Sequence, residues 1–378
     1  MDAYQLRTDY IKHATRIVIK VGSNVLTENQ GLNIKAIRRL TIQICELLDQ
    51  EKEIIIVSSG AMAAGIRKLN FSSRPTEIPK RQAIAAVGQA TLMREYEKAF
   101  EFFDRKVAQL LLTSEDLSDR ERYLNARNTL QTLLSWKVIP IVNENDTVSI
   151  AEIKFGDNDN LSALISLLTE ADLLIILTDI SGLYDKDPRT SSDATIIPYI
   201  KTITKSLETC AGEIPGALGT GGMMAKLKAA KKLMSAGIPM IIAGERKDIL
   251  RDIFSGKEEG SFFIPKTEKM CSKKRWMAFS VKPKGQIQID DGAAKAILTN
   301  GKSLLPIGIH HISGDFKIGD TVELISNDNR VLGIGLVNYP MKEINIIKGL
   351  KSSEIESRLG SCPYDEVIHR NNMVLSCF

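Results

Sequence analysis

The sequence is poor in the residues that build metal sites and disulfide frameworks. It has four histidines and five cysteines in 378 residues, and no two cysteines stand in CxxC spacing. The adjacent His310 and His311 would point to opposite faces of a strand. These absences argue against a zinc site and against structural disulfides, so reduced thiols in a cytoplasm are expected.

The sequence also lacks a large excess of charge and any long apolar run. Its formal net charge is +4, too small to suggest the basic face that nucleic acids select, which argues against RNA as a partner. The first residues lack the apolar core of a signal peptide. No apolar run approaches the roughly 20 residues that a membrane helix needs. We therefore expect a cytoplasmic protein with no membrane contact.

Two common nucleotide-binding motifs are missing as well. Gly301-Lys302-Ser303 resembles the end of a P-loop, but Ala296 stands where the first glycine belongs. Gly333-Ile334-Gly335 lacks the third glycine of a dinucleotide fingerprint, because Asn338 occupies that position. Any nucleotide site must therefore be built in another way.

What the sequence does contain, up to about residue 264, is an alternation of apolar runs and amphipathic segments. The expected strands are 16–21, 53–57, 106–112, 138–142, 173–177 and 238–242. The expected helices are 34–48, 61–69, 81–103, 119–134 and 161–169. Strands that are apolar throughout indicate a parallel sheet covered on both faces. We predict an α/β fold, a three-layer αβα sandwich with a mainly parallel sheet.

Polar clusters follow the predicted strands where each of them ends. They are Gly22-Ser23-Asn24, Ser58-Ser59-Gly60, Asn143 to Asp146, and Thr178-Asp179. Ligands of open parallel sheets bind beyond the carboxyl ends of the strands. The clusters therefore predict one shared active site at that edge.

The chain changes character after about residue 264. A length of 378 residues is more than one hydrophobic core usually supports, so two domains are expected. We predict a catalytic domain at 1–268, a charged linker at 269–283 and a small, mostly β, barrel-type domain at 284–363. Its one expected helix is Asp291 to Asn300. The chain beyond Ser361, with a tail at 364–378, is expected to be loosely structured.

A glycine-rich segment, Gly219 to Lys226, opens a helix that runs to about Ala236. Glycines admit an anion close to the backbone, and a helix N-terminus favours phosphate. Lys226 lies near the first turn, where the helix dipole disfavours a cation unless a phosphate is bound. The alternative is a flexible linker before a lysine-rich surface helix.

Two further residues each allow two interpretations. Lys20 lies in an apolar strand, where a lysine is costly unless it is paired or meets a ligand. Alternatively, it faces water from an edge strand. Ser59 either binds a substrate carboxylate or only caps the helix that follows it.

Acidic and amide residues gather in Asn143 to Asp146 and again in Asp157 to Asp159. Asn158 or Asp159 could cap the next helix. Carboxylates so close together raise one another's pKa, so we expect cations nearby, such as an ammonium group, a lysine or Mg²⁺. Thr178-Asp179 alone could be a polar turn.

Together these motifs resemble, in order and spacing, the glutamate 5-kinases of the amino acid kinase family. The resemblance covers nearly the whole chain, and from about Gly285 the sequence resembles a PUA domain. It rests on Lys20 to Ser23, Ser58 to Ala61, Asn143 to Asp146, Gly156 to Ala163, Leu177 to Asp179 with Gly182 to Tyr184, and Gly219 to Lys226. The segments Gln82 to Gln89 and Asp119 to Arg127 are similar too.

The resemblance implies ATP-dependent phosphorylation of the γ-carboxylate of L-glutamate to L-glutamyl 5-phosphate, the first step of L-proline biosynthesis. It implies Mg²⁺ carried by ATP, with no direct protein ligand. It also implies feedback inhibition by proline, a homo-oligomer (dimer or tetramer) and a hand-off to glutamate-5-semialdehyde dehydrogenase.

The resemblance also assigns roles to residues. Lys20 and Lys226 would contact the transferring phosphoryl group, and Asp157 and Asp159 would orient these lysines or hold Mg²⁺ through water. The residues that would hold glutamate are Ser59, Asp146 and Asn158. Those that would line the ATP site are Lys20, Thr178, Asp179, Thr220, Gly221, Gly222, Met223, Met224, Ala225 and Lys226. Ala225 departs from the family pattern, where a threonine is usual, and residues 1–15 receive no role.

This chemistry needs positive charge more than a base. The γ-carboxylate has a reference pKa near 4.3 and is already ionised at neutral pH, so repulsion from ATP is the main obstacle.

The alternative functions are a related kinase for N-acetylglutamate, aspartate or a nucleoside monophosphate, and an RNA-binding, regulatory or assembly role of the PUA-like domain. The acidic Asn143 to Asp146 favours a substrate with a free ammonium. Thr147 to Phe155 would cover the glutamate, and Glu152 and Ile153 would affect proline sensitivity.

Overall fold

The computed structural model describes residues 2–28, 31–148, 158–188, 190–212, 222–266, 281 and 283–375. The chain divides into two units, Met1–Lys269 and Met270–Phe378. The predicted linker at 269–283 falls almost entirely outside the described ranges. Each unit has its own buried apolar cluster.

The first unit is built on an eight-stranded sheet in the order β5-β6-β4-β1-β7-β9-β10-β8. All neighbouring strands are parallel except β9 and β10. In chain order the strands are β1 (Arg16–Val21), β4 (Glu53–Ser58), β5 (Val107–Leu112), β6 (Ile139–Glu144), β7 (Leu173–Thr178), β8 (Tyr199–Ile200), β9 (Met240–Gly244) and β10 (Ser261–Phe263). The prediction of a mainly parallel sheet is confirmed.

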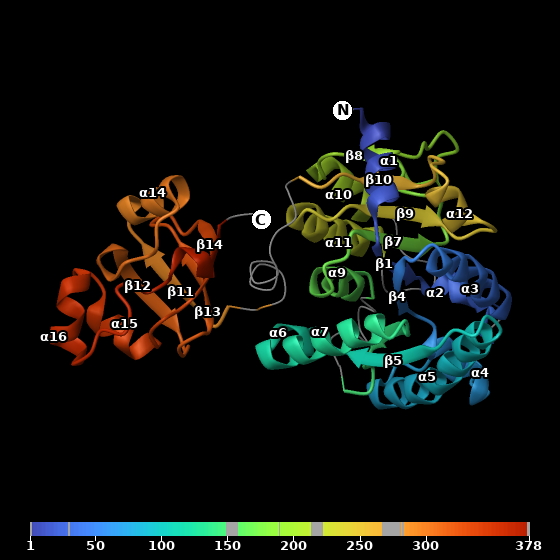
Figure 1. Cartoon of the computed structure of the whole chain (residues 1–378), viewed down its shortest axis with the longest axis horizontal. Helices are drawn as coiled ribbons and strands as arrows, with labels where there is room; N and C mark the ends of the chain where they lie inside the picture. The colour runs from blue at the N-terminus through green and yellow to red at the C-terminus, as the bar shows by residue number, and fades with distance from the viewer. Residues whose placement is uncertain are drawn as a thin grey trace. The chain divides into compact units, whose positions relative to one another are not determined.

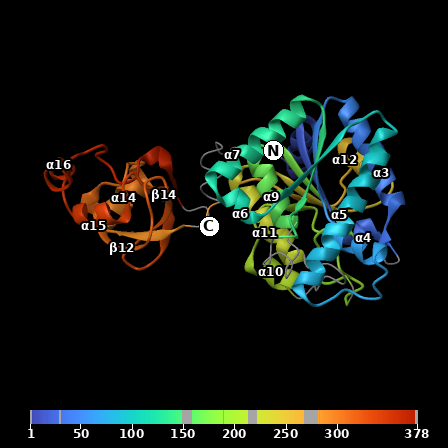
Figure 2. The same ribbon diagram turned by 90° about the horizontal axis from the view of Figure 1, so that it is seen from below.

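Helices cover both faces of this sheet (Figures 1 and 2). The larger helices of the unit are α1 (Ala3–His13), α3 (Ile34–Asp49), α4 (Ala61–Lys68), α5 (Ile78–Glu101), α7 (Arg120–Ser135), α9 (Asn158–Leu168), α10 (Lys205–Gly212) and α11 (Met223–Ala236). Shorter elements are α2 (Ser23–Leu26), α6 (Ser114–Ser118), α12 (Ile249–Phe254) and the hairpin of β2 (Thr27–Glu28) and β3 (Gly31–Leu32). The turn expected after β1 is therefore the short helix α2.

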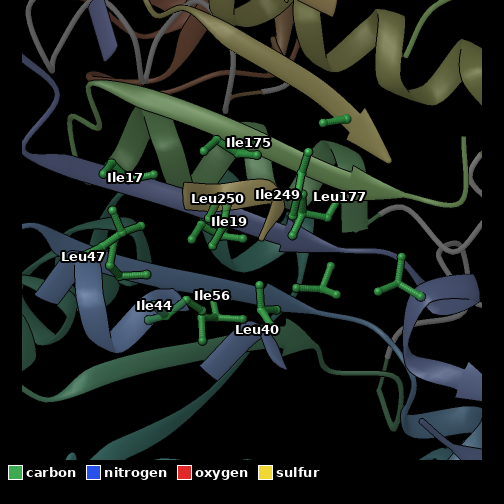
Figure 3. Close-up of a cluster of buried hydrophobic side chains, with 14 of the residues drawn as sticks. Ile17, Ile19, Leu40, Ile44, Leu47, Ile56, Ile175, Leu177, Ile249 and Leu250 are labelled. Atoms are coloured by element: carbon green, nitrogen blue, oxygen red, sulfur yellow. The ribbon is translucent and has the colours of Figure 1, made fainter. Parts of the chain in front are cut away.

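The two faces of β1 meet different partners because side chains alternate along a strand. Ile17 and Ile19 point into the apolar cluster made with α3 and α12, which Figure 3 shows. Lys20 has the opposite parity, so it points to the other face, which α9 and α11 cover (Figure 1). The alternation thus separates a dry apolar layer from the layer that holds the polar site.

The N-terminal helix α1, which received no role from the sequence, is part of this unit. Its Arg7 is almost fully buried, and Arg7 Nη2 donates hydrogen bonds to Lys257 O (3.2 Å) and Glu259 O (2.7 Å). Ile11 belongs to the main apolar cluster. These contacts hold α1 against the chain segment that precedes β10.

Helices α4 and α5 pack with their backbones in close approach. A Cβ atom on Gly65 would lie 1.9 Å from Ile84 O, and one on Gly88 would lie 1.8 Å from Ala61 O. No side chain fits at either position, so these two glycines fix how α5 lies along α4.

The second unit contains a five-stranded sheet in the order β12-β11-β13-β14-β15. The strands are β11 (Gly285–Ile289), β12 (Ile309–Gly314), β13 (Thr321–Ile325), β14 (Val331–Leu336) and β15 (Met373–Leu375). The helices are α14 (Asp291–Asn300), α15 (Met341–Ile347) and α16 (Ile355–Leu359), with 3-10 turns η1 (Pro306–Gly308), η2 (Ser352–Glu354) and η3 (Arg370–Asn372). The predicted helix over Asp291–Asn300 is present, and α15 and α16 are additional.

The expectation of a loosely structured end to the chain is wrong for its described part. β15 pairs antiparallel with β14, and Val367 and Ile368 are fully buried in the apolar cluster of this unit. Burial of these apolar side chains and pairing of the strand supply the free energy that orders the segment. Across the described ranges, no helix combines the length and apolar character that crossing a bilayer requires.

Candidate active site

Lys20 lies at the carboxyl end of the central strand β1. It is aligned with Val57 of β4 on one side and with Ile176 of β7 on the other. Its exposed fraction is 6%. The interpretation of Lys20 as a solvent-facing lysine on an edge strand is therefore wrong.

Asp159 joins Lys20 to Lys226, and the three side chains form a buried charged cluster. Lys20 Nζ lies 2.7 Å from Asp159 Oδ1, and Lys226 Nζ lies 3.1 Å from Asp159 Oδ2. The two ammonium groups come from β1 and α11, and the carboxylate comes from the first turn of α9. One carboxylate between two ammonium groups leaves this cluster of three side chains with a net positive charge.

The electrostatics keep Asp159 ionised. Burial alone would raise the pKa of this carboxyl, but the charges and hydrogen bonds of Lys20 and Lys226 outweigh burial and lower it. Both carboxyl oxygens face lysines, so the capping role that the sequence allowed for Asp159 is wrong. An acid in the first turn of α9 also interacts favourably with the helix dipole.

Beside this cluster, Asn158 is the centre of a neutral network. Asn158 Nδ2 lies 2.9 Å from Ser59 Oγ, 3.1 Å from Asn143 Oδ1 and 3.4 Å from Ser58 O. Its Oδ1 atom is buried and has no hydrogen-bond partner among the described residues. The network therefore presents an unused acceptor.

Ser59 reaches this network because the chain turns sharply after β4. The next residue, Gly60, has φ +103°, a conformation that favours glycine. Gly60 is also the N-cap residue of α4, which receives no side-chain capping bond. The interpretation of Ser59 as a helix cap is therefore wrong, and its hydroxyl faces Asn158 instead.

Asp146 follows β6 at the same edge of the sheet and is half-buried. Burial and the charge of Arg74 lower the pKa of Arg81, and the charge of Asp146 opposes them, so Asp146 and Arg81 are electrostatic neighbours. The structure thus brings Ser59 and Asn158 into direct contact and places Asp146 next to a cation of α5.

A third group of polar residues follows β7. Asn24 Nδ2 donates to Asp179 Oδ2 (2.7 Å), and Thr178 Oγ1 donates to Asp179 Oδ1 (2.9 Å). Burial would raise the pKa of Asp179, yet these hydrogen bonds and the charge of Lys226 lower it. Gly22 lies between this group and the lysines, since a Cβ there would be 3.8 Å from Lys20 Nζ.

The glycine-rich segment leads into α11, whose N-cap residue is Gly222. Met223 and Lys226 are buried, whereas Met224 and Ala225 are half-buried. The backbone N–H of Ala225 donates to Gly222 O (3.1 Å). Asp157, Thr220 and Gly221 lie outside the described residues, so their predicted roles stay predictions.

The site's donor set fits a metal that arrives with a nucleotide. In the described part of the chain, no group of three or more His, Cys, Asp or Glu residues could hold a metal ion. Asp159 has one oxygen on each of the two lysines. Mg²⁺ usually keeps several waters and is bound through one or two carboxylates together with substrate phosphates.

Sequence reasoning gave no individual role to several residues of the site. Asn143 accepts from Asn158, Asn24 supports Asp179, and Tyr96 of α5 lies 3.0 Å from Ser58 Oγ through its hydroxyl. Burial raises the pKa of Tyr96 to about 12. Asn24 and Asn143 stand in the polar clusters that end β1 and β6, and that position was a usable signal. Tyr96 lies within a long helix and carried none.

Comparisons with known proteins identify the families and relatives that this chain resembles. Residues 15–244 match the amino acid kinase family, and residues 285–359 match the PUA domain. The chain is 48% identical over 370 residues to a glutamate 5-kinase of Syntrophus aciditrophicus, covering 98% of this chain and 96% of the relative. It is also 48% identical over 372 residues to a glutamate 5-kinase of Geobacter sulfurreducens, covering 98% and 100%. Among solved structures, carbamate kinase from Giardia lamblia bound to AMP-PNP has a TM-score of 0.48 at 17% identity, covering 67% of this chain and 99% of that one.

Proposed function

The chain belongs to the amino acid kinase family, within which it groups with the glutamate 5-kinases, and from this membership we propose how its residues phosphorylate the γ-carboxylate of L-glutamate with ATP. The product is L-glutamyl 5-phosphate, made in the first step of proline synthesis. The observation that carries the proposal is the buried Lys20–Asp159–Lys226 cluster at the carboxyl ends of the central strands.

Lys20 and Lys226 are the catalytic residues. The nucleophile and ATP are both anionic, so the reaction is limited by repulsion and by alignment of the reacting groups. Two lysines on one carboxylate hold a positive charge fixed in a buried site, where it acts more strongly than in water. Asp159 positions both ammonium groups and does not take part in proton transfer.

Glutamate is held by the neutral network and by Asp146. The Ser59 hydroxyl and the Asn158 amide can hydrogen-bond the amino acid, and the unused Asn158 Oδ1 is an acceptor for the α-ammonium group. Asp146 supplies a negative charge at the same edge of the sheet. This arrangement fits a free amino acid better than an N-acetylated one, which lacks the ammonium charge.

ATP lies on the β7 side of the cluster in this proposal. Thr178 and Asp179 line its site, together with the start of α11 from Gly222 to Lys226, whose N-terminal N–H groups favour phosphate. Thr220 and Gly221 would extend the same wall. Mg²⁺ bound to the phosphates would reduce their negative charge. Because Ala225 has no hydroxyl, the phosphates here would contact backbone N–H groups and Lys226.

The finer properties of the family are part of the proposal. They are a cytoplasmic location, a homo-oligomeric state (dimer or tetramer), inhibition by proline and a hand-off to glutamate-5-semialdehyde dehydrogenase. Residues 149–157 lie outside the described ranges, so Glu152 and Ile153 remain candidates for proline sensitivity. Substitutions at these two positions that leave proline inhibition unchanged would remove this part of the proposal.

The activity is tested by an ATP-dependent hydroxamate assay, which traps the acyl phosphate directly. We expect strong hydroxamate formation with L-glutamate and little with N-acetylglutamate or aspartate. Equal or faster turnover of N-acetylglutamate would contradict the assignment of the ammonium site. A gel-shift assay with RNA over a range of salt concentrations separately tests an RNA-binding role of the PUA domain.

A further inference from the structure

Gln89 of α5 is a buried amide that the proposed mechanism does not use. Its exposed fraction is 7%. Gln89 Oε1 accepts a 2.8 Å hydrogen bond from Asn143 Nδ2, while Gln89 Nε2 is buried and has no partner among the described residues. A buried amide with an unused donor is unfavourable, so the bond to Asn143 is the contact that sets its orientation.

The position of Gln89 is fixed by the packing of its helix. It directly follows Gly88, which lies against the backbone of α4, and Gly65 of α4 lies against Ile84 of α5. Helix α4 in turn begins directly after Ser59 and Gly60. The packing of these two helices therefore fixes the position of Gln89 relative to Ser59.

The hydrogen bonds of Asn143 have only one consistent orientation. The backbone N–H of Glu144 can only donate, and it donates to Asn143 Oδ1 (2.9 Å). Asn143 Nδ2 must then face Gln89, which has to offer its oxygen. The same Asn143 Oδ1 accepts from Asn158 Nδ2 (3.1 Å), so the Asn158 oxygen is left facing away from Asn143.

We propose that Gln89 is a positioning residue that, together with the backbone N–H of Glu144, fixes which atom of Asn158 faces the substrate. The proposal rests on the proposed function, because the Asn158 oxygen is taken to accept from the α-ammonium of glutamate. Gln89 holds Asn143 in place, Asn143 holds Asn158 Nδ2, and Asn158 Oδ1 therefore remains the acceptor. Without Gln89, Asn143 Nδ2 loses its acceptor, and the Asn143 amide turns to find another.

The test compares binding of glutamate with binding of glutarate, which has both carboxylates but no ammonium group. In Gln89→Met we expect the KM for glutamate to rise about tenfold, the size expected for one buried hydrogen bond. The kcat, the KM for ATP and the inhibition constant of glutarate should stay within about twofold. The tenfold rise in the KM for glutamate corresponds to about 1.4 kcal/mol. Gln89→Glu keeps the acceptor oxygen and should keep the wild-type KM.

A matched control is Gln43→Met. Gln43 is also a buried glutamine, with hydrogen bonds to Arg39 O and from the N–H of Leu250, outside the Asn158 network. We expect it to lower stability without changing the KM for glutamate. If Gln89→Met fails to fold, Gln89→Asn gives the same test, because it retains an amide but withdraws the oxygen by one carbon–carbon bond, about 1.5 Å.

The outcomes separate this inference from the proposed function. No hydroxamate from wild-type protein and glutamate would contradict the function itself. An active wild-type protein whose Gln89→Met and Gln89→Asn variants keep the KM for glutamate would overturn this inference alone. Equal weakening of glutamate and glutarate would also overturn it, because that pattern indicates general damage. In an Asn143→Ala background, Gln89→Met should add nothing.

Discussion

The site has a charged half and a neutral half, and the two differ in how their groups are held. In the charged half, Lys20 and Lys226 meet on one carboxylate, so each ammonium group is held by direct contact with the same negative charge. In the neutral half, Asn158 is held by a hydroxyl and an amide. Asn158 and Asp159 are neighbours in the first turn of α9, and this turn therefore supplies both halves.

The difference between the halves predicts which kinetic constant, kcat or KM, a substitution in each half should change. A fixed positive charge helps most where negative charge is compressed, during phosphoryl transfer. Neutral hydrogen bonds to the amino acid act on substrate and transition state alike, so they contribute uniform binding. Substitutions in the charged half should lower kcat, and those in the neutral half should raise KM.

The largest effect is expected from removing a lysine of the charged half. Lys20→Ala and Lys226→Ala should each lower kcat by roughly 1,000-fold, the scale for one group that stabilises transition-state charge. The KM for glutamate should change only a few-fold. Steady-state kinetics check this, with Lys228→Ala, an exposed lysine of α11, as the control. Normal turnover of Lys226→Ala would show that the transition-state assignment is wrong.

Removing the carboxylate should damage the fold as well as the reaction. Asp159→Asn leaves two buried ammonium groups without their counter-charge, which costs about 3–5 kcal/mol of unfolding free energy for a buried pair. Urea denaturation measures the loss. Asp193→Asn, which removes an exposed partner of Lys186, should have no measurable effect. Wild-type stability of Asp159→Asn would mean that the cluster does not exist as described.

A substitution at the acidic residue of the substrate side should have the opposite kinetic signature. Asp146→Ala should raise the KM for glutamate by about 50-fold, the scale for a hydrogen bond to a charged group, with kcat nearly unchanged. In Asp146→Asn the KM for glutamate should rise less, because the asparagine side chain keeps an acceptor oxygen. A fall in kcat as large as that of Lys226→Ala would erase the distinction between the halves.

The smallest expected effect is the pH dependence of stability that Asp159 contributes. Its pKa in the folded protein lies below its unfolded value of about 3.9. Its stabilisation is therefore complete above about pH 5 and is lost as the pH falls through the folded pKa. The stability difference between wild type and Asp159→Asn should be constant from pH 5 to 8 and shrink below pH 4. A difference that grows on acidification would contradict this sign.

The fold could be predicted from the sequence because its signals are local. The apolar runs of β1, β4 and β7 are continuous, and the polar clusters stand directly after them. The second unit was less predictable, since α15, α16 and β15 are short and their order comes from packing in the core. The pattern of apolar residues within a short segment does not show whether that segment will pack against strands that are distant in the sequence.

The site could be predicted only in part, for a similar reason. Lys20 and Lys226 stood out as lysines in apolar or glycine-rich surroundings. That Asp159 bridges them, rather than capping α9, depends on which side of α9 meets β1. The contact of Gln89 with Asn143 spans 54 positions, and only the packing of α5 against α4 brings the two together.

The separation of the two halves is the central claim, and the most direct measurement compares one residue of each half in the same assay. Initial rates would be measured across glutamate concentrations at saturating ATP for Asn158→Ala and Lys226→Ala. The account predicts that Asn158→Ala raises the KM for glutamate and keeps most of kcat, whereas Lys226→Ala loses kcat and keeps KM. Similar losses of kcat in both variants, with KM unchanged, would contradict it.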